Sequence, residues 1–234
     1  MSTPLFNLDT RATRLPVADG SSSYPVRRIF CVGRNYAAHA AEMGAEVERQ
    51  APFYFTKSPA ALAASGQTLP YPPGTQDYHH EVELVVAIGA EAFRIGAPEA
   101  EAAIYGYACG LDMTRRDLQL AARERQLPWD MAKDVENSAI IAALTPAEAF
   151  GPPADQRIQL WLNGELRQDA RLSDLVWGIA ELISNLSAFY HLGPGDLIMT
   201  GTPAGVGPVQ PGDDIIGAIE GLAPVRLTIG KAAE

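Results

Sequence analysis

Hydrophobic and polar positions along His79–Ile88 predict a strand that becomes buried along its length. The segment alternates polar and apolar residues at its start and is then fully apolar, which is typical of a strand whose second half is covered on both faces. In such a strand Glu81 and Glu83 project from the same face, with their backbone positions about 7 Å apart. Both carboxylates therefore point in one direction at the place where burial begins.

A second apolar run, Ile104–Leu111, ends in Asp112 and leads into a predicted helix. The helix is expected over residues 114–126, because a proline follows shortly after it. Helical spacing places Arg116 and Gln119 on one face of this helix.

In the second half of the chain, the pattern predicts a hairpin and an amphipathic helix. Asn163-Gly164 separates two short runs within Leu160–Arg167, and this dipeptide supplies the positive φ angles of a two-residue hairpin turn. From Ser173, a good N-cap residue, apolar residues recur at helical spacing up to Gly193. We expect this helix to lie against a sheet.

The C-terminal third repeats a short phrase, Pro-Gly-Asp, at 194–196 and 211–213, and each copy precedes an apolar run. The pattern predicts tight turns that lead into the strands of a β-rich module. Several glycines between the two copies suggest a phosphate-binding loop. Pro208 and the lack of a following amphipathic helix argue against a dinucleotide-binding turn.

Residues 1–24 are predicted to form an N-terminal arm, and residues 25–234 a single domain. A length of 234 residues suits one hydrophobic core, and the arm has little apolar content of its own. After the arm, an Ala-rich stretch from Ala37 to Met43 favours a short helix that Gly44 terminates.

The composition is that of a soluble globular protein that does not bind nucleic acid. With 18 Lys and Arg against 28 Asp and Glu the net charge is −10, so a positive surface for phosphates is missing. A site for an anion must therefore be made positive locally, by a metal ion or a few Lys and Arg side chains. Cys31 and Cys109 lie in apolar runs, as reduced buried thiols do, and no segment reaches the ~20 apolar residues of a membrane span. We expect a cytoplasmic protein without membrane contact.

Three carboxylates adjoin these apolar runs and predict a metal site. Glu81, Glu83 and Asp112 offer hard oxygen ligands with no cysteine nearby, a set that suits Mg²⁺ or Mn²⁺ better than zinc. Two other interpretations are open at this point, an exposed polar strand face for the glutamates and a helix N-cap for Asp112. His79 and His80 point to opposite faces of a regular strand, so both cannot join one site.

His39 and Glu42 lie three residues apart on the predicted short helix. A carboxylate that orients an imidazole makes histidine a general base toward water, so the pair is a candidate catalytic dyad. The same spacing also fits a surface pair worth roughly a few tenths of a kcal/mol. Lys133, taken alone, is expected to be a solvated side chain.

Taken together, these segments resemble the fumarylacetoacetate hydrolase family from about Val26 to Ile229. The resemblance rests on five motifs in order: Gly33-Arg34-Asn35-Tyr36 with His39 and Glu42; His80-Glu81-Val82-Glu83-Leu84; Leu111-Asp112-Met113-Thr114-Arg115-Arg116-Asp117-Leu118-Gln119; Pro128-Trp129 with Lys133; and Thr200-Gly201-Thr202-Pro203-Ala204-Gly205-Val206-Gly207-Pro208. Each motif alone is weak, but their order and separations together make the match specific.

The resemblance implies an α+β, β-rich fold, a mixed β-roll with a few packed helices, and a homodimer. It implies that residues 25–234 form the catalytic domain and that a divalent metal, Mg²⁺ or Mn²⁺ with Ca²⁺ as a substitute in crystals, is held by Glu81, Glu83 and Asp112. It also implies that the short helix with the His–Glu pair is a lid over bound substrate. The pocket residues that it implies are Arg34, Arg116, Gln119, Lys133 and Thr202.

Within the family, the phrases Val26–Gly33 and Pro128–Lys133 are most similar to members that hydrolyse fumarylpyruvate in gentisate degradation. The acidic stretch Asp134–Ser138 departs from the residues expected there and leaves the substrate open. Hydrolysis of other acylpyruvates, decarboxylation of oxaloacetate and a silent binding protein are the alternatives.

The reaction implied is metal-dependent hydrolysis of a carbon–carbon bond in a 2,4-dioxo acid. His39, oriented by Glu42, would deprotonate a water that attacks the 4-carbonyl. The candidates for the remaining roles are Lys133 and Gln119 for the oxyanion, and Arg34 and Arg116 for the distal carboxylate.

Overall fold

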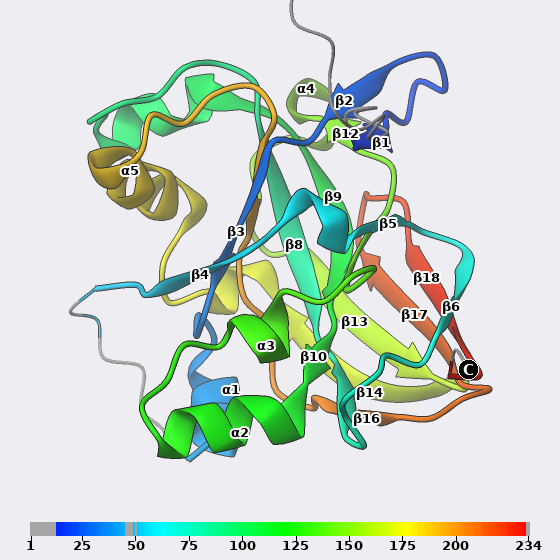
Figure 1. The fold of residues 1–234 in the computed structure, drawn as a ribbon. Helices are drawn as coiled ribbons and strands as arrows, with labels where there is room; N and C mark the ends of the chain where they lie inside the picture. The colour runs from blue at the N-terminus through cyan, green and yellow to red at the C-terminus, as the bar shows by residue number, and fades with distance from the viewer. Residues whose placement is uncertain (1–12, 45–48, 50, 233–234) are drawn as a thin grey trace, which may run out of the picture.

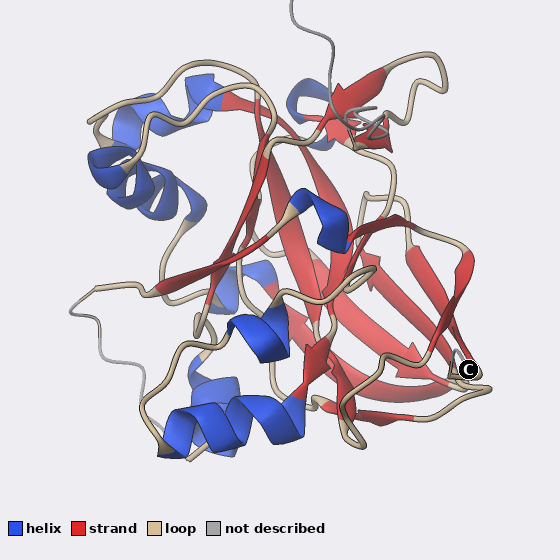
Figure 2. Cartoon of the chain, viewed as in Figure 1, coloured by secondary structure: helices blue, strands red, loops and turns tan. Residues whose placement is uncertain are grey.

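Two mixed β-sheets form the body of the molecule, and short helices lie at their ends (Figures 1 and 2). The structure, a computed structural model, describes residues 13–44, 49 and 51–232. The larger sheet has eight strands, in the order β4 (Tyr54–Lys57), β3 (Arg28–Val32), β15 (Asp196–Met199), β8 (Val82–Ile88), β9 (Ile104–Asp112), β11 (Ala139–Ile141) and β5 (Leu62–Ala64), with β12 (Thr145–Pro146) paired to β9. The second sheet has five strands, in the order β14 (Glu165–Arg171), β13 (Arg157–Leu162), β17 (Asp214–Ile219), β18 (Val225–Gly230) and β6 (Gln67–Pro70).

Smaller elements complete the fold. A two-stranded sheet contains β1 (Arg14–Pro16) and β2 (Ser23–Pro25), and a three-stranded sheet contains β10 (Thr114–Arg115), β7 (Tyr78–His80) and β16 (Gly207–Val209). The helices are α1 (Ala37–Glu42), α2 (Arg116–Glu124), α3 (Asp130–Lys133), α4 (Ala147–Phe150) and α5 (Ile179–Phe189), with 3-10 helices at Pro59–Ala61, Ala97–Ala103 and Leu172–Asp174. Within the described ranges, no helix has the length and apolar character needed to cross a membrane. The predicted α+β, β-rich class is confirmed.

β8 contributes to both clusters of the hydrophobic core. All of its residues are buried. Leu84, Val86 and Ile88 pack into a cluster shared with the five-stranded sheet, whereas Val85 and Ala87 pack into a second cluster on the other face of the large sheet. Successive side chains of a strand point to opposite faces, so one apolar run supplies both clusters. The predicted burial on both faces is confirmed.

The predicted hairpin is confirmed, and the two Pro-Gly-Asp turns also lead into strands. Asn163 and Gly164 adopt φ angles of 52° and 82° between β13 and β14. The turns at 194–196 and 211–213 precede β15 and β17, but these strands lie in different sheets. The expected C-terminal module is therefore wrong, because β15 pairs with β3 and β8 from the first half of the chain.

The helix expected from Ser173 begins later than the sequence predicted. The Ser173 hydroxyl donates to Asp155 within a 3-10 turn instead of capping a helix. α5 begins at Ile179, after Gly178, whose N–H donates to the Glu181 carboxylate at 2.8 Å. A glycine cap combined with a glutamate one turn inside the helix sets this start.

The helix predicted over residues 114–126 begins later than expected, because its first two residues form β10. Thr114 and Arg115 pair with β7, so α2 starts at Arg116. The strand expected over His79–Ile88 is likewise interrupted at Glu81, between β7 and β8. Pairing with distant strands overrides the local preference at both places.

The described part of the N-terminal arm packs onto the large sheet. β1 and β2 form a hairpin, and Leu15 and Tyr24 are buried in the second core cluster. The Tyr24 hydroxyl accepts the Gly195 N–H at 2.8 Å. Residues 1–12 lie outside the described residues, and the division of the chain at residue 24 stays a prediction.

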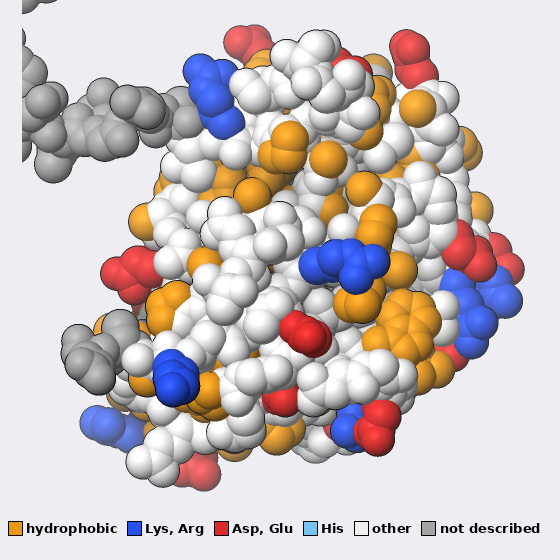
Figure 3. Space-filling model, turned by 90° about the vertical axis from the view of Figure 1, so that its right-hand side faces the viewer, with side chains coloured by type: hydrophobic (Ala, Val, Ile, Leu, Met, Phe, Trp, Pro, Cys, Tyr) orange, Lys and Arg blue, Asp and Glu red, His pale blue; other side chains and the backbone are white. Residues whose placement is uncertain are grey.

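The charges on one face of the molecule and the state of the two cysteines agree with what the composition predicted. On the face shown in Figure 3, acidic and basic side chains are interspersed, and the coloured residues form no broad basic area. Cys31 and Cys109 are free and buried, as expected of reduced thiols.

Asp196, at the start of β15, carries a buried charge. Its carboxylate accepts hydrogen bonds of 2.6 to 3.1 Å from Arg27, Arg28 and the Gly193 N–H. Burial by itself raises the pKa, but the hydrogen bonds from Arg28 and Arg27 outweigh it and hold the pKa below its usual value of 3.8. These contacts join the start of β3 to the turn before β15.

We predict that Asp196→Asn lowers the free energy of unfolding at neutral pH by about 2 to 3 kcal/mol, because hydrogen bonds to a buried charge are lost. Since its folded-state pKa is lowered, the carboxylate stabilises the fold above pH 3.8, and this contribution disappears as the pH falls through the folded-state value. Urea unfolding of the two proteins should therefore converge in strongly acidic buffer. Asp169→Asn, which breaks an exposed pair with Arg157, is the control and should change stability little. Equal losses in both variants would contradict the prediction.

Candidate active site

A pocket opens at the end of the large sheet where α1, α2 and α3 come together (Figure 1). The predicted site residues that line it are Arg34, His39, Glu81, Glu83, Arg116, Gln119, Lys133 and Thr202. The sequence analysis assigned no pocket role to the rest of the wall, which includes Val32, Met43, Phe55, Leu120, Arg123 and Trp129.

Strand register brings the three predicted carboxylates together. Val82 pairs with Leu111 in the β8–β9 ladder, so Glu81 and Asp112 are neighbours, and the Asp112 N–H donates to the Glu81 carbonyl at 2.8 Å. Glu83 follows two residues later on the same face. One oxygen from each carboxylate lies within 4.8 Å of the others, and all three residues are buried. One cation can therefore contact all three.

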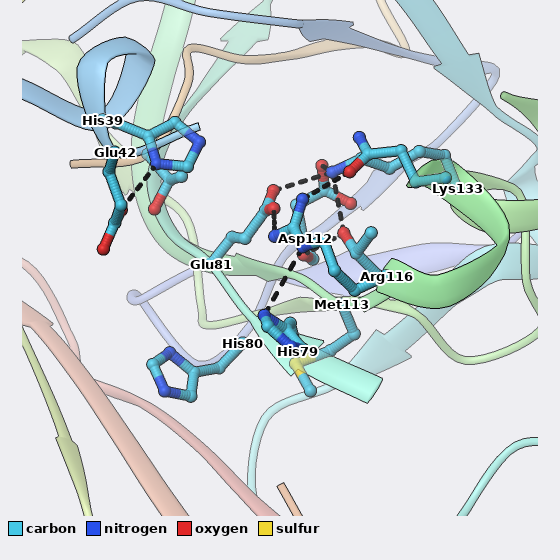
Figure 4. Close-up of polar contacts among 12 residues, drawn as sticks. His39, Glu42, His79, His80, Glu81, Asp112, Met113, Arg116 and Lys133 are labelled. Atoms are coloured by element: carbon cyan, nitrogen blue, oxygen red, sulfur yellow. Dashed lines mark hydrogen bonds and ion pairs between the residues drawn. The ribbon is translucent and has the colours of Figure 1, made fainter. Parts of the chain in front are cut away.

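Two cationic side chains from the helices neutralise part of this charge (Figure 4). Lys133, on α3, donates to Glu81, to Asp112 and to the Thr114 hydroxyl, each at 2.7 Å. Arg116, at the start of α2, also pairs with Glu81. Burial raises the pKa of Glu81, but Lys133 and Arg116 outweigh it and hold that pKa well below its usual range. Glu81 is therefore ionised at neutral pH.

Lys57 is a third cation, which the sequence analysis did not identify. Its ammonium group lies 2.9 Å from Asp112 Oδ1, donates to the Ser138 hydroxyl at 2.7 Å and also donates to the Lys133 carbonyl. The side chain is fully buried at the end of β4. A lysine that ends a short strand gives little sequence signal, because lysines are rarely buried without a partner that lies elsewhere in the chain.

The surroundings of Glu83 differ from those of the other two carboxylates. It accepts the Gly201 N–H at 2.8 Å and forms no ion pair with a described residue. Burial, followed by the charges of Asp112 and Glu81, raises the pKa of Glu83 well above its usual value. Asp112 Oδ1 is buried, and the Lys57 ammonium group lies 2.9 Å from it. Three hard oxygen donors, of which Glu83 has no cationic partner among the described residues, fit a divalent cation such as Mg²⁺ or Mn²⁺.

His39 and Glu42 form a pair on α1 that faces these carboxylates (Figure 4). His39 Nδ1 lies 3.2 Å from Glu42 Oε2, and His39 is buried. Glu42 also accepts the Gly205 N–H at 3.1 Å, which fixes α1 against the loop after β15. The other edge of the imidazole turns toward Glu81, across the pocket.

The two predicted arginines have different surroundings. Arg116 is buried and is hydrogen-bonded to Glu81 and to Gln119 Oε1. Arg34 is half-buried and forms no ion pair with a described residue. Burial, and then the nearby positive charge of Arg123, lowers the pKa of Arg34. Two cations, Arg34 and Arg123, therefore lie near each other at the pocket wall.

The alternatives left open by the sequence do not describe these residues. Asp112 ends β9 and is not the N-cap of α2, which Arg115 precedes. Lys133 is 3% exposed and is not solvated. Neither His79 nor His80 belongs to the described carboxylate cluster, and burial lowers the pKa of His80 to about 4.

Comparison with known proteins identifies relatives along most of the chain. A family model described as fumarylacetoacetate (FAA) hydrolase C-terminal matches residues 28–230. Fumarylpyruvate hydrolase of Ralstonia sp is 50% identical over 193 residues, which cover 81% of this chain and 100% of the relative. An oxaloacetate tautomerase of Escherichia coli (strain K12) is 40% identical over 199 residues, which cover 85% of this chain and 90% of the relative.

A solved structure shares the fold over nearly the whole chain. The crystal structure of fumarylpyruvate hydrolase from Pseudomonas aeruginosa in complex with Mn²⁺ and pyruvate superposes with a TM-score of 0.93 at 45% identity, covering 98% of this chain and 100% of that one. From the family match and these relatives together, the chain belongs to the fumarylacetoacetate hydrolase family and is a hydrolase of carbon–carbon bonds.

Proposed function

We propose that this enzyme is a metal-dependent hydrolase that cleaves 3-fumarylpyruvate to fumarate and pyruvate in gentisate degradation. The observation that carries the proposal is the buried His39, paired with Glu42 and facing three clustered carboxylates across the pocket. The Ralstonia and Pseudomonas aeruginosa relatives support this substrate, and the second of them holds Mn²⁺ and pyruvate. A cytoplasmic homodimer is part of the same proposal.

His39 is placed to act as the general base. Glu42 bonds Nδ1, so that nitrogen carries the proton and Nε2 is free to accept one from water. The water oxygen then bonds to C4 of the substrate. When the C3–C4 bond breaks, its electron pair stays with C3, fumarate is formed at C4, and the proton held by His39 is available to C3 of the departing pyruvate.

Glu81, Glu83 and Asp112 would hold the divalent cation, Mg²⁺ or Mn²⁺. Bound there, the cation would supply positive charge to the 2-oxo acid end of the substrate. The net negative charge of the chain makes such a local positive charge necessary for an anionic substrate. Lys133 fixes the orientation of two of these carboxylates by donating to both.

Gln119 is the better placed donor for the oxygen that becomes negative at C4. Arg116 binds the amide oxygen of Gln119, so the NH₂ group remains for the pocket that this side chain lines. The three N–H bonds of Lys133 are directed at Glu81, Asp112 and Thr114. Lys133 can therefore reach the substrate only by exchanging one of these partners, and its first role is to hold the carboxylates.

Arg34 is proposed to bind the distal carboxylate of fumarylpyruvate. The substrate has two carboxylates, and the cation accounts for only one of them. Arg116 is engaged with Glu81 and Gln119, whereas Arg34 lines the pocket without an ion pair to a described residue.

A second candidate function is turnover of oxaloacetate. Oxaloacetate tautomerases of Escherichia coli and Mus musculus are each 40% identical to this chain. Tautomerisation moves a proton at C3 and itself uses a general base, whereas decarboxylation releases CO₂ from C3 and needs no attacking water. Loss of the base His39 should therefore spare decarboxylation of oxaloacetate but not hydrolysis of fumarylpyruvate.

We predict that Glu83→Gln gives a folded but inactive protein. In excess chelator its melting temperature should equal or exceed that of the wild type, because a carboxylate repelled by its neighbours is removed. Added Mn²⁺ should raise the melting temperature of the wild type and not that of the variant. The exposed Glu148→Gln is the control for both measurements. Full wild-type activity in excess chelator would end the metal hypothesis.

We predict that His39→Ala lowers kcat for fumarylpyruvate by about 10²- to 10⁴-fold, which is the contribution of a general base. Any decarboxylation of oxaloacetate should be largely spared in the same variant. His191→Ala, at an exposed histidine stacked on Phe93, is the control. Hydrolysis that survives the loss of His39 would require a different base.

We predict that Arg34→Met shifts substrate selectivity. It should lower kcat/KM for fumarylpyruvate by about 10- to 100-fold, because a hydrogen bond between two charged groups is lost, and change that for acetylpyruvate much less. Arg116→Met should impair both substrates, since it disturbs Glu81 and Gln119. If Arg34→Met lowers kcat/KM equally for both substrates, Arg34 does not bind the distal carboxylate.

A further inference from the structure

Gln168 is the one buried residue of β14. Its side chain is fully buried, whereas every other residue of β14 is exposed or half-buried. The loop that carries Thr202 lies directly on this strand. At Gly205, where φ is +95°, a Cβ would lie 2.0 Å from the Arg167 carbonyl oxygen, so the close approach of the loop requires glycine.

Main-chain groups fix the orientation of the Gln168 amide. The Val82 N–H donates to Oε1 at 3.0 Å, and Nε2 donates to the Pro203 carbonyl at 2.7 Å. A main-chain N–H can only donate and a carbonyl can only accept. A flipped amide would therefore place the NH₂ group against the Val82 N–H and the amide oxygen against the Pro203 carbonyl. The remaining hydrogen of Nε2 points to Thr202 Oγ1, at 2.8 Å.

The fixed amide also fixes what the Thr202 hydroxyl can do. Because Oγ1 accepts from Gln168, its own proton must be directed elsewhere. Thr202 lines the pocket, and none of the described residues accepts this proton. The hydroxyl is therefore left as a donor at the pocket wall.

We propose that Gln168 is a positioning residue that presents the Thr202 hydroxyl as a hydrogen-bond donor to an oxygen of the substrate. The inference rests on the proposed function only for the choice of substrate. Gln168 does not line the pocket, so its effect on the reaction passes through Thr202. A buried amide whose donors and acceptor are all used holds its partner rigidly.

A double-mutant cycle tests this coupling. Gln168→Met and Thr202→Val are made singly and together, and kcat/KM for fumarylpyruvate is measured with Mn²⁺ present. In each single variant kcat/KM should fall by about 10- to 100-fold, which is the range for loss of a hydrogen bond to a charged group. The double variant should be within about 2-fold of Thr202→Val alone, because Gln168 has nothing left to position. Thr202→Ser should retain most of the activity.

Losses that multiply in the double variant would overturn the inference, because Gln168 would then act independently of Thr202. Gln159→Met, on the neighbouring strand β13, is the matched control and should leave kcat/KM unchanged. If Gln168→Met does not fold, Gln168→Glu keeps the oxygen for Val82 and removes the Nε2 donor, and it enters the same cycle. A wild type that turns over oxaloacetate but not fumarylpyruvate would refute the proposed function alone, and the cycle is then run with oxaloacetate.

Discussion

Three carboxylates buried at one point are the constraint on which the site and much of the fold depend. The β8–β9 register places Glu81 beside Asp112, and the two-residue repeat of a strand adds Glu83. Burial makes such a cluster costly unless positive charge is brought to it. β4, α2 and α3 each supply one cation, and Glu83, which has no cationic partner among the described residues, is a further ligand suited to a divalent metal. The helices at this end of the sheet are thus tied to the carboxylates by charge.

The second sheet contributes to the site through the loop that follows β15. Gln168 reaches this loop from β14, and the Gly205 N–H of the same loop donates to Glu42 on α1. The strand β14, the loop and α1 therefore form one connected series of hydrogen bonds. His39 and Thr202 take their positions from it, while the carboxylates take theirs from the large sheet.

The sequence predicted the parts that depend on local pattern. The apolar run after Glu83 identified β8, and Asn163-Gly164 identified the hairpin. It failed where distant partners decide the outcome: Ser173 bonds to Asp155 instead of starting a helix, and Thr114 joins a strand. Within the site, Lys57 and Gln168 were missed for the same reason, because each is defined by contacts to residues far along the chain. The predicted site residues were found together because each came from a motif shared with the family.

The fate of the water oxygen during turnover shows directly whether the enzyme hydrolyses the C3–C4 bond. Fumarylpyruvate is converted in ¹⁸O-labelled water with Mn²⁺, and the products are examined by mass spectrometry at early times, with a chelator-treated sample beside it. Metal-dependent hydrolysis should give fumarate and pyruvate in equal amounts, with one labelled oxygen in the new carboxylate of fumarate and no product in the chelator-treated sample. Formation of unlabelled fumarate, or equal turnover without the metal, would contradict it.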